Sequence, residues 1–168
     1  MRERLAEGGV FCQWLAGWQI GAFELESIAE SLRAAFPHVA IWQLSRSDQR
    51  PLFALVAVEE PRQISRAGLQ ARMDQRRPPP VGAENVLRSA NDVVAWYVGD
   101  WTPSPGVQQN TDEHPVVEFS APMTQRHRTR RLLRATFHDY YESRLLSLSR
   151  RAFSFDPPAA PTERYRTR

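Results

Sequence analysis

The first sixty positions of the chain contain short apolar runs separated by one stretch with helical spacing. The runs at 10–15, 39–44 and 52–58 are apolar almost throughout, which is typical of strands that are buried on both faces. Between the first two runs, apolar residues recur at helical spacing over 23–36, and Pro37 marks the end of that helix. The pattern predicts the order strand, helix, strand, hairpin, strand.

After residue 60 the sequence becomes more polar and its periodicity weakens. It predicts helices over 63–76, 83–98 and 129–151, and a short extended piece over 116–119. We therefore divide the chain into an α/β part over 1–60, a helical and loop extension over 61–122, a basic amphipathic helix over 123–156 and a disordered tail over 157–168.

Composition excludes several classes of chemistry. All 22 basic residues are arginine, against 19 acidic residues and a net charge of +3, so the chain has no P-loop or Schiff-base lysine. The single cysteine, Cys12, excludes an intrachain disulfide, and its apolar neighbours predict an inert buried thiol. No apolar run approaches the roughly 18 residues of a membrane span. These features predict a soluble, cytoplasmic protein.

Two segments carry a resemblance to a known family. Residues 4–15 read RLAEGGVFCQWL, and residues 110–119 read NTDEHPVVEF and are followed by Ala121-Pro122. They resemble segments of the spermidine synthase-like (polyamine aminopropyltransferase) proteins, above all the members that are fused to a membrane region. The sequence FPHVAIW at 36–42 resembles the next strand of that family. The resemblance covers about residues 2–60 and 83–122.

The resemblance implies an incomplete class I methyltransferase-like Rossmann fold, comprising the C-terminal half of the sheet and a mainly helical extension. Complete relatives transfer an aminopropyl group from decarboxylated S-adenosylmethionine to a diamine such as putrescine. Their glycine-rich cosubstrate turn and their acidic catalytic motif precede the segment that resembles 4–15. We therefore expect a C-terminal fragment that holds no cofactor and no catalytic residue, and that is inactive alone.

The resemblance also suggests one substrate-binding residue. In aminopropyltransferases a glutamine at the carboxyl end of the corresponding strand lines the amine pocket, and Gln13 matches it. Ligands of open α/β sheets bind at that end of the strands. The soluble members follow this glutamine with a glycine and an acid, where the present chain has Trp14 and Leu15. A strand-end amide that bonds a neighbouring loop is the alternative interpretation of Gln13.

The second segment forms a motif of unknown role, with Asn110, Asp112, Pro115 and Glu118 as its marked positions. The acidic residues and His114 suggest a metal site, but neighbours on an extended segment point to opposite sides. We favour a proline-bounded turn in which Asp112 caps the local backbone. Glu118 is a candidate partner for an arginine of the basic helix.

The segment 124–151 contains eight arginines, at 126, 128, 130, 131, 134, 144, 150 and 151. An amphipathic helix of this charge is able to bind nucleic acid or an anionic membrane surface, which is the alternative function for this chain. A docked surface helix with solvated arginines is the simpler interpretation. The first strand is also expected to expose an edge through which the chain self-associates.

Overall fold

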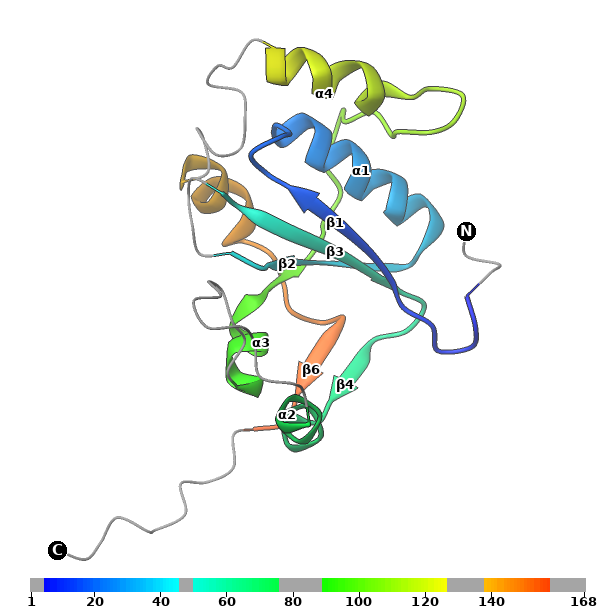
Figure 1. The fold of residues 1–168 in the computed structure, drawn as a ribbon. Coiled ribbons are helices and arrows are strands. Elements are labelled where there is room, and N and C mark those ends of the chain that lie inside the picture. Colours follow the sequence, from blue (N-terminus) through cyan, green and yellow to red (C-terminus); the bar gives the residue numbers. More distant parts are fainter. Residues whose placement is uncertain (1–4, 46–49, 76–88, 127–137, 158–168) are drawn as a thin grey trace, which may run out of the picture.

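A four-stranded sheet lies at the centre of the molecule (Figure 1). The computed structural model describes residues 5–45, 50–75, 89–126 and 138–157. The sheet has the order β1-β3-β2-β5, and its strands are β1 (Phe11–Ala16), β2 (His38–Gln43), β3 (Leu52–Val58) and β5 (Tyr97–Asp100). Neighbouring strands are antiparallel throughout. The predicted α/β class is confirmed, and the three predicted strands lie within one residue of their expected positions.

Strand β3 lies between β1 and β2 and pairs with both of them. Because both partners are antiparallel to β3, β1 and β2 are parallel to each other. Parallel strands require a long crossover connection, and the helix α1 (Ala22–Ala35) provides it.

Helix α1 covers one face of the sheet (Figure 1). It starts at Gly21, whose N–H donates to Oε2 of Glu24 at 2.8 Å, and it ends before Phe36 because the following Pro37 disfavours helical backbone there. Leu25, Ala29 and Leu32 recur at helical spacing and are buried against the strands.

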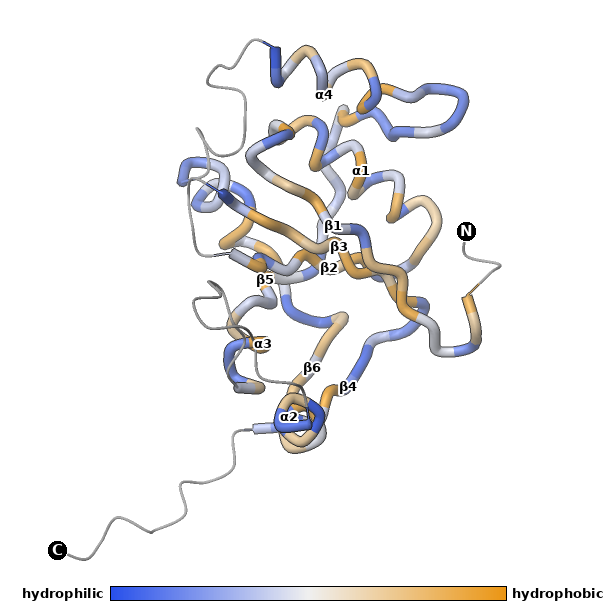
Figure 2. Tube along the Cα trace, viewed as in Figure 1, coloured by the Kyte–Doolittle hydropathy of each residue, from blue (hydrophilic) through white to orange (hydrophobic). Residues whose placement is uncertain are grey.

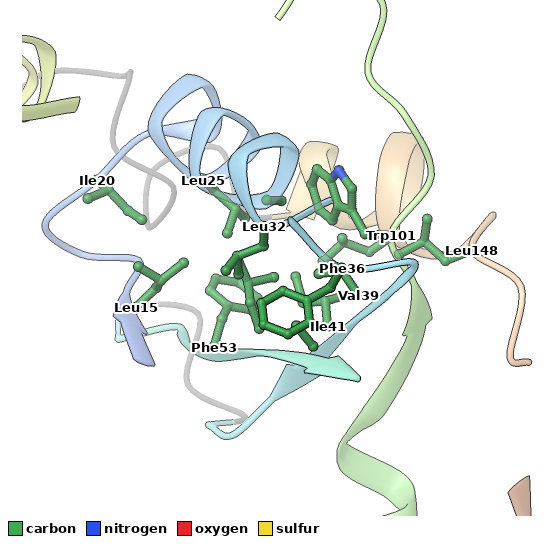
Figure 3. Packing of buried hydrophobic residues seen from close by; sticks show 14 of the residues in the cluster. Leu15, Ile20, Leu25, Leu32, Phe36, Val39, Ile41, Phe53, Trp101 and Leu148 are labelled. Carbon is green, nitrogen blue, oxygen red and sulfur yellow. The ribbon is translucent and has the colours of Figure 1, made fainter. Parts of the chain in front are cut away.

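The larger core lies between α1 and the sheet (Figure 3). Alternate residues of the strands point into it, and Trp101, which follows β5, closes one side. Trp101 is 1% exposed, its indole N–H donates to Oε1 of Glu30 at 3.0 Å, and the guanidinium of Arg144 lies 4.7 Å from its ring centroid. This contact joins α1 to residues that lie far along the chain.

The opposite face of the sheet is covered by short elements. These are α3 (Ala90–Trp96) and a two-stranded parallel sheet of β4 (Arg62–Ile64) and β6 (Phe153–Phe155), beside which lies α2 (Arg66–Asp74). Trp42 of β2 is at the centre of this second core, with its ring centroid 5.2 Å from Tyr97 and 5.5 Å from Phe153. Figure 2 shows the apolar residues concentrated along the sheet strands and on α1.

Two predicted helices are shorter than the pattern indicated. The helix expected over 63–76 is α2, which starts at Arg66, where Ser65 accepts a hydrogen bond from the N–H of Gly68. The helix expected over 83–98 is α3 from Ala90, and the residues 83–88 lie outside the described part of the chain. Tyr97 leaves the helix and starts β5, because its pairing with β2 and its burial outweigh local helical spacing.

The last two predictions for secondary structure are also corrected. Residues 116–119 are not extended but form the start of helix α4 (Val116–Arg126), which packs on α1. The helix expected over 129–151 does not continue to 151: residues 141–145 form the π-helix η2 (Tyr141–Leu145), and β6 follows, because Phe153 packs on Trp42. Residues 127–137 lie outside the described range. In the parts of the chain that are described, no helix has the length and apolar character needed to cross a membrane.

The outer edge of β5 is covered by the segment that leads into β6. The N–H of Asp100 donates to the carbonyl of Ser149 at 2.7 Å, and the carboxylate of Asp100 accepts from the N–H groups of Arg151 at 2.6 Å and Ala152 at 3.0 Å. The hydroxyl of Tyr97 donates to the same carboxylate, and burial together with this carboxylate raises the pKa of Tyr97 above its usual value of 10.0.

We predict that Gly99→Ala destabilises the chain, because Leu148 and Ser149 lie so close to Gly99 that no room is left for a side chain. A Cβ at Gly99 would lie 2.6 Å from Cβ of Leu148 and 2.7 Å from the carbonyl oxygen of Ser149. Overpacking of this kind lowers the free energy of unfolding by about 1–3 kcal/mol, measured by urea denaturation.

Gly68→Ala is the matched control, since its Cβ would meet nothing closer than 3.6 Å and Gly68 lies inside α2. That variant should gain about 0.5–1 kcal/mol through reduced entropy of the unfolded chain. Equal stability of the two variants would contradict the packing of 148–152 on β5.

Candidate functional site

Gln13 lies within β1 and not at its carboxyl end. Strand β1 continues to Ala16, because Trp14, Leu15 and Ala16 keep pairing with β3. The expected strand-end position of Gln13 is therefore wrong. Its side chain is exposed, and its Nε2 donates to the carbonyl of Trp14 at 3.2 Å. A role in substrate binding stays a prediction.

The loop after β1 is closed by tight packing. The N–H of Gly17 donates to the carbonyl of Pro51 at 2.8 Å, and a Cβ at Gly17 would lie 2.9 Å from that oxygen and 3.0 Å from the ring of Phe53. Further along, Glu24 is 2% exposed and its carboxylate accepts from the N–H of Gly21 at the start of α1. The carboxyl group of Glu24 thus already occupies the N-terminus of this helix, which favours neither a phosphate nor another carboxylate there.

The motif at 110–118 starts helix α4. Oδ1 of Asn110 accepts from the N–H of Val117 at 2.9 Å, and its Nδ2 donates to Oε1 of Glu118 at 3.4 Å. Thr111 and His114 exchange backbone hydrogen bonds of 3.1 Å, so the predicted turn before Pro115 is confirmed. The expected capping residue is wrong: Asn110, and not Asp112, supplies the oxygen that satisfies an N–H of the first helical turn.

Asn110 also attaches this turn to α1. The hydroxyl of Ser31 donates to the carbonyl of Asn110 at 2.9 Å, and the N–H of Asn110 donates back to Oγ of Ser31 at 2.7 Å. At the other end of α4, the hydroxyl of Thr124 donates to Oε1 of the buried Glu24 at 2.9 Å. Helix α4 is thus held on α1 by hydrogen bonds near both of its ends, while Phe119 is 73% exposed.

At the motif, the structure does not gather a set of metal ligands. Asp112, Glu113 and His114 are exposed, and the described residues contain no cluster of three or more potential ligands drawn from histidine, cysteine, aspartate and glutamate. The structure also does not bring the motif to Gln13: within the described chain, no hydrogen bond or ion pair joins them. The sequence left the role of Asn110 unassigned. In the structure this role is structural, because Asn110 caps α4 and bonds Ser31 of α1.

Of the arginines at 126, 144, 150 and 151, which lie in the described part of the chain, Arg144 and Arg150 donate side-chain hydrogen bonds to other segments. Arg144 donates from Nη1 to the hydroxyl of Thr102 at 2.7 Å and from Nη2 to Oγ of Ser104 at 2.8 Å. Arg150 donates from Nε to the carbonyl of Val98 at 3.1 Å. The expectation that these side chains are solvated is therefore wrong for Arg144, which is half-buried, whereas Arg150 is exposed. The arginines at 128, 130, 131 and 134 lie outside the described residues.

Cys12 is exposed, so the expected buried core thiol is wrong. Its side chain alternates with Leu15 and Phe11 along β1 and points to the sheet face opposite α1. Partial desolvation by its surroundings still raises the pKa of the Cys12 thiol above 9.0, which disfavours the reactive thiolate near neutral pH.

Sequence reasoning missed a pocket of about 250 Å³ beside the start of α2. It is lined by Gln63, Ile64, Ser65, Gly68, Leu69 and Arg72. The sequence around it carries no pocket motif: Ser65, a good N-cap residue, indicates only where α2 starts. Arg72 supplies positive charge, but this lining contains no pair of groups for acid–base or nucleophilic catalysis.

We predict that Asn110→Ala lowers the free energy of unfolding by about 1 kcal/mol, because the first turn of α4 loses its cap. Asp112→Ala is the control: Asp112 is exposed and makes no hydrogen bond to another described residue, so its change should stay within about 0.5 kcal/mol. Urea denaturation of both variants measures the difference. A larger loss for Asp112→Ala would return the capping role to the aspartate.

No protein-family model, curated protein or solved structure matches the chain.

Proposed function

We propose that this chain is the C-terminal part of an aminopropyltransferase-like domain of the spermidine synthase-like family, in which it contributes one wall of a diamine pocket. The observation that carries the proposal is the order β1-β3-β2, with the antiparallel β3 between two strands that are parallel to each other. The closing half of a class I methyltransferase-like sheet has this arrangement, a reversed strand inserted beside the last parallel strands. Helix α1 connects β1 and β2, as a crossover between parallel strands requires.

The chemistry attributed to complete relatives is a nucleophilic displacement. The amine nitrogen of the diamine bonds to the carbon next to the sulfonium, the carbon–sulfur bond breaks, and a base takes a proton from the nitrogen. Catalysis then depends on orienting the amine in line with the bond that breaks and on removing its proton. We assign this chain a part only in the orientation of the amine.

The described residues do not fit a cradle for the decarboxylated S-adenosylmethionine that serves as aminopropyl donor. Pro51 and Phe53 crowd Gly17, the glycine that follows β1. Glu24 accepts the N–H of Gly21, the residue that caps the start of α1. We therefore derive no catalytic step through the donor in this chain.

Gln13 is the residue that we propose for the diamine. Its Nε2 is directed to the carbonyl of Trp14, which leaves its Oε1 without a hydrogen-bond donor among the described residues. An amide oxygen is a good acceptor for the N–H groups of a protonated amine. Gln13 is also exposed, so a ligand reaches it without rearrangement of the core.

We expect the chain alone to show no aminopropyl transfer and no calorimetric binding of decarboxylated S-adenosylmethionine. Co-expression with the N-terminal half of a spermidine synthase, which supplies the donor site and the base, should restore transfer to putrescine. In that complex, Gln13→Ala should raise the KM for putrescine about tenfold with little change in the KM of the donor, because one charge-assisted hydrogen bond is lost.

Gln63→Ala is the matched control, since Gln63 is an exposed glutamine on β4 whose amide bonds Asp156. Micromolar binding of the donor by the chain alone would contradict the proposed division of the domain. An unchanged putrescine KM in Gln13→Ala would remove Gln13 from the amine pocket.

The alternative function, binding of nucleic acid or of an anionic membrane surface, depends on the arginines at 128, 130, 131 and 134. These residues lie outside the described part of the chain. Within that part, Arg144 and Arg150 donate hydrogen bonds to other segments of the chain. A cytoplasmic location stays a prediction.

A further inference from the structure

The two edges of the central sheet differ in how they are covered. Beyond β5, the segment that includes Ser149 and Arg150 accepts from and donates to the outer backbone of Asp100 and Val98. Beyond β1, no described residue pairs with the strand, and β1 is the end of the sheet order. An uncovered edge presents backbone N–H and C=O groups that are able to pair with another strand.

The direction of these groups follows from the register of β1 on β3. The N–H of Gly17 donates to the carbonyl of Pro51 at 2.8 Å, which places the backbone groups of Gly17 on the side of β3. Because these directions alternate along an antiparallel strand, the N–H and C=O groups of Cys12 and Trp14 point away from β3. The carbonyl of Trp14 is the one to which the side chain of Gln13 donates, as expected for a group at the open edge.

This edge lacks the features that normally prevent pairing. The eleven residues from Val10 to Ile20 contain no charged side chain and no proline. Val10 is 48% exposed and Trp14 is 62% exposed, so the edge is flanked by apolar surface. Exposed edge strands of natural proteins usually carry a lysine or another charged residue, a proline or a β-bulge, each of which opposes pairing with another strand.

We propose that β1 is a self-association surface whose partner is β1 of a second copy of this chain, paired antiparallel about a two-fold axis. The two four-stranded sheets then form one sheet of eight strands. Charge favours a copy as the partner: an uncharged strand placed against itself brings no like charges together and leaves no charge unpaired. Antiparallel pairing places Cys12 and Trp14 of both copies on the same face, where their exposed apolar surface is buried.

The proposal concerns the 168-residue chain and does not depend on the proposed function. The central sheet of each copy has one open edge among its described strands, so pairing through that edge closes at two copies. Gln13 then opposes the pairing, because its amide already donates to the carbonyl of Trp14, which the partner strand needs as an acceptor.

Sedimentation equilibrium of the purified chain and of three variants tests the surface. Wild type should form a dimer, and Cys12→Pro should weaken it at least tenfold, because proline removes an outward N–H that β3 does not use. Cys12→Val is the matched control and should dimerise like wild type. Gln13→Ala should tighten the dimer roughly tenfold, because each copy then offers one more carbonyl for pairing.

Circular dichroism and thermal melting establish that each variant is folded. If Cys12→Pro does not fold, Trp14→Lys provides the same test, since the exposed indole leaves room for a charge that opposes pairing. A short bis-maleimide should cross-link the two Cys12 thiols of wild type, and the reaction is run at pH 8.5 because the pKa of Cys12 is raised.

A wild-type chain that stays monomeric at the highest concentration overturns the proposal. A dissociation constant that is unchanged in Cys12→Pro or in Trp14→Lys also overturns it, because the contact between copies would then lie elsewhere. Formation of open-ended oligomers overturns it as well. A raised putrescine KM of the co-expressed Gln13→Ala complex, without a change in dimerisation of the Gln13→Ala chain, would support the proposed function and reject the edge. Tighter dimerisation of that chain with an unchanged putrescine KM of the complex would support the edge and reject the role of Gln13 in the amine pocket.

Discussion

The structure depends on the pairing of β3 on both sides. Its backbone bonds β1 and β2 at once, and its side chains are buried on both faces of the sheet. Phe53 and Leu55 face the core under α1, while Ala54 and Val58 face the second core. A strand in this position requires a covering layer on each face, because exposure of either set of side chains would cost the hydrophobic stabilisation that the sheet depends on. Helix α1 forms one layer, and α3 with the β4–β6 pair forms the other (Figure 1).

The outer layers are attached by polar contacts. Helix α4 contains no buried residue, and it is held on α1 by Ser31 at one end and by Glu24 at the other. The carboxylate of Glu24 is stable in the interior because both of its oxygens accept hydrogen bonds. On the other side, Asp100 binds the backbone that leads into β6. Segments far apart in the sequence are thus joined through carboxylates and hydroxyls that are individually satisfied.

This construction separates the two segments that carry the family resemblance. The motif that starts at Asn110 is engaged by α1 and α4, and its amide and hydroxyl groups are used in holding that helix. Gln13 is exposed on β1 and uses only half of its amide within the chain. The two segments therefore differ in their free polar groups. The polar groups of Asn110 bond other parts of the chain, whereas Oε1 of Gln13 accepts no hydrogen bond from a described residue.

The sequence alone was sufficient for the three strands and the helix of the first sixty residues, because apolar runs and a stretch of helical spacing report local burial directly. It also indicated the turn before Pro115, since the chemistry of such turns is local. Tertiary structure decided the rest. Tyr97 has helical spacing with the residues before it but joins β2. Val116 and Val117 are β-branched but belong to a helix, because Asn110, which caps its first turn, is held by Ser31. The exposure of Cys12 and the internal contacts of Arg144 and Arg150 likewise depend on which distant segment covers each face, and local pattern carries no information about that choice.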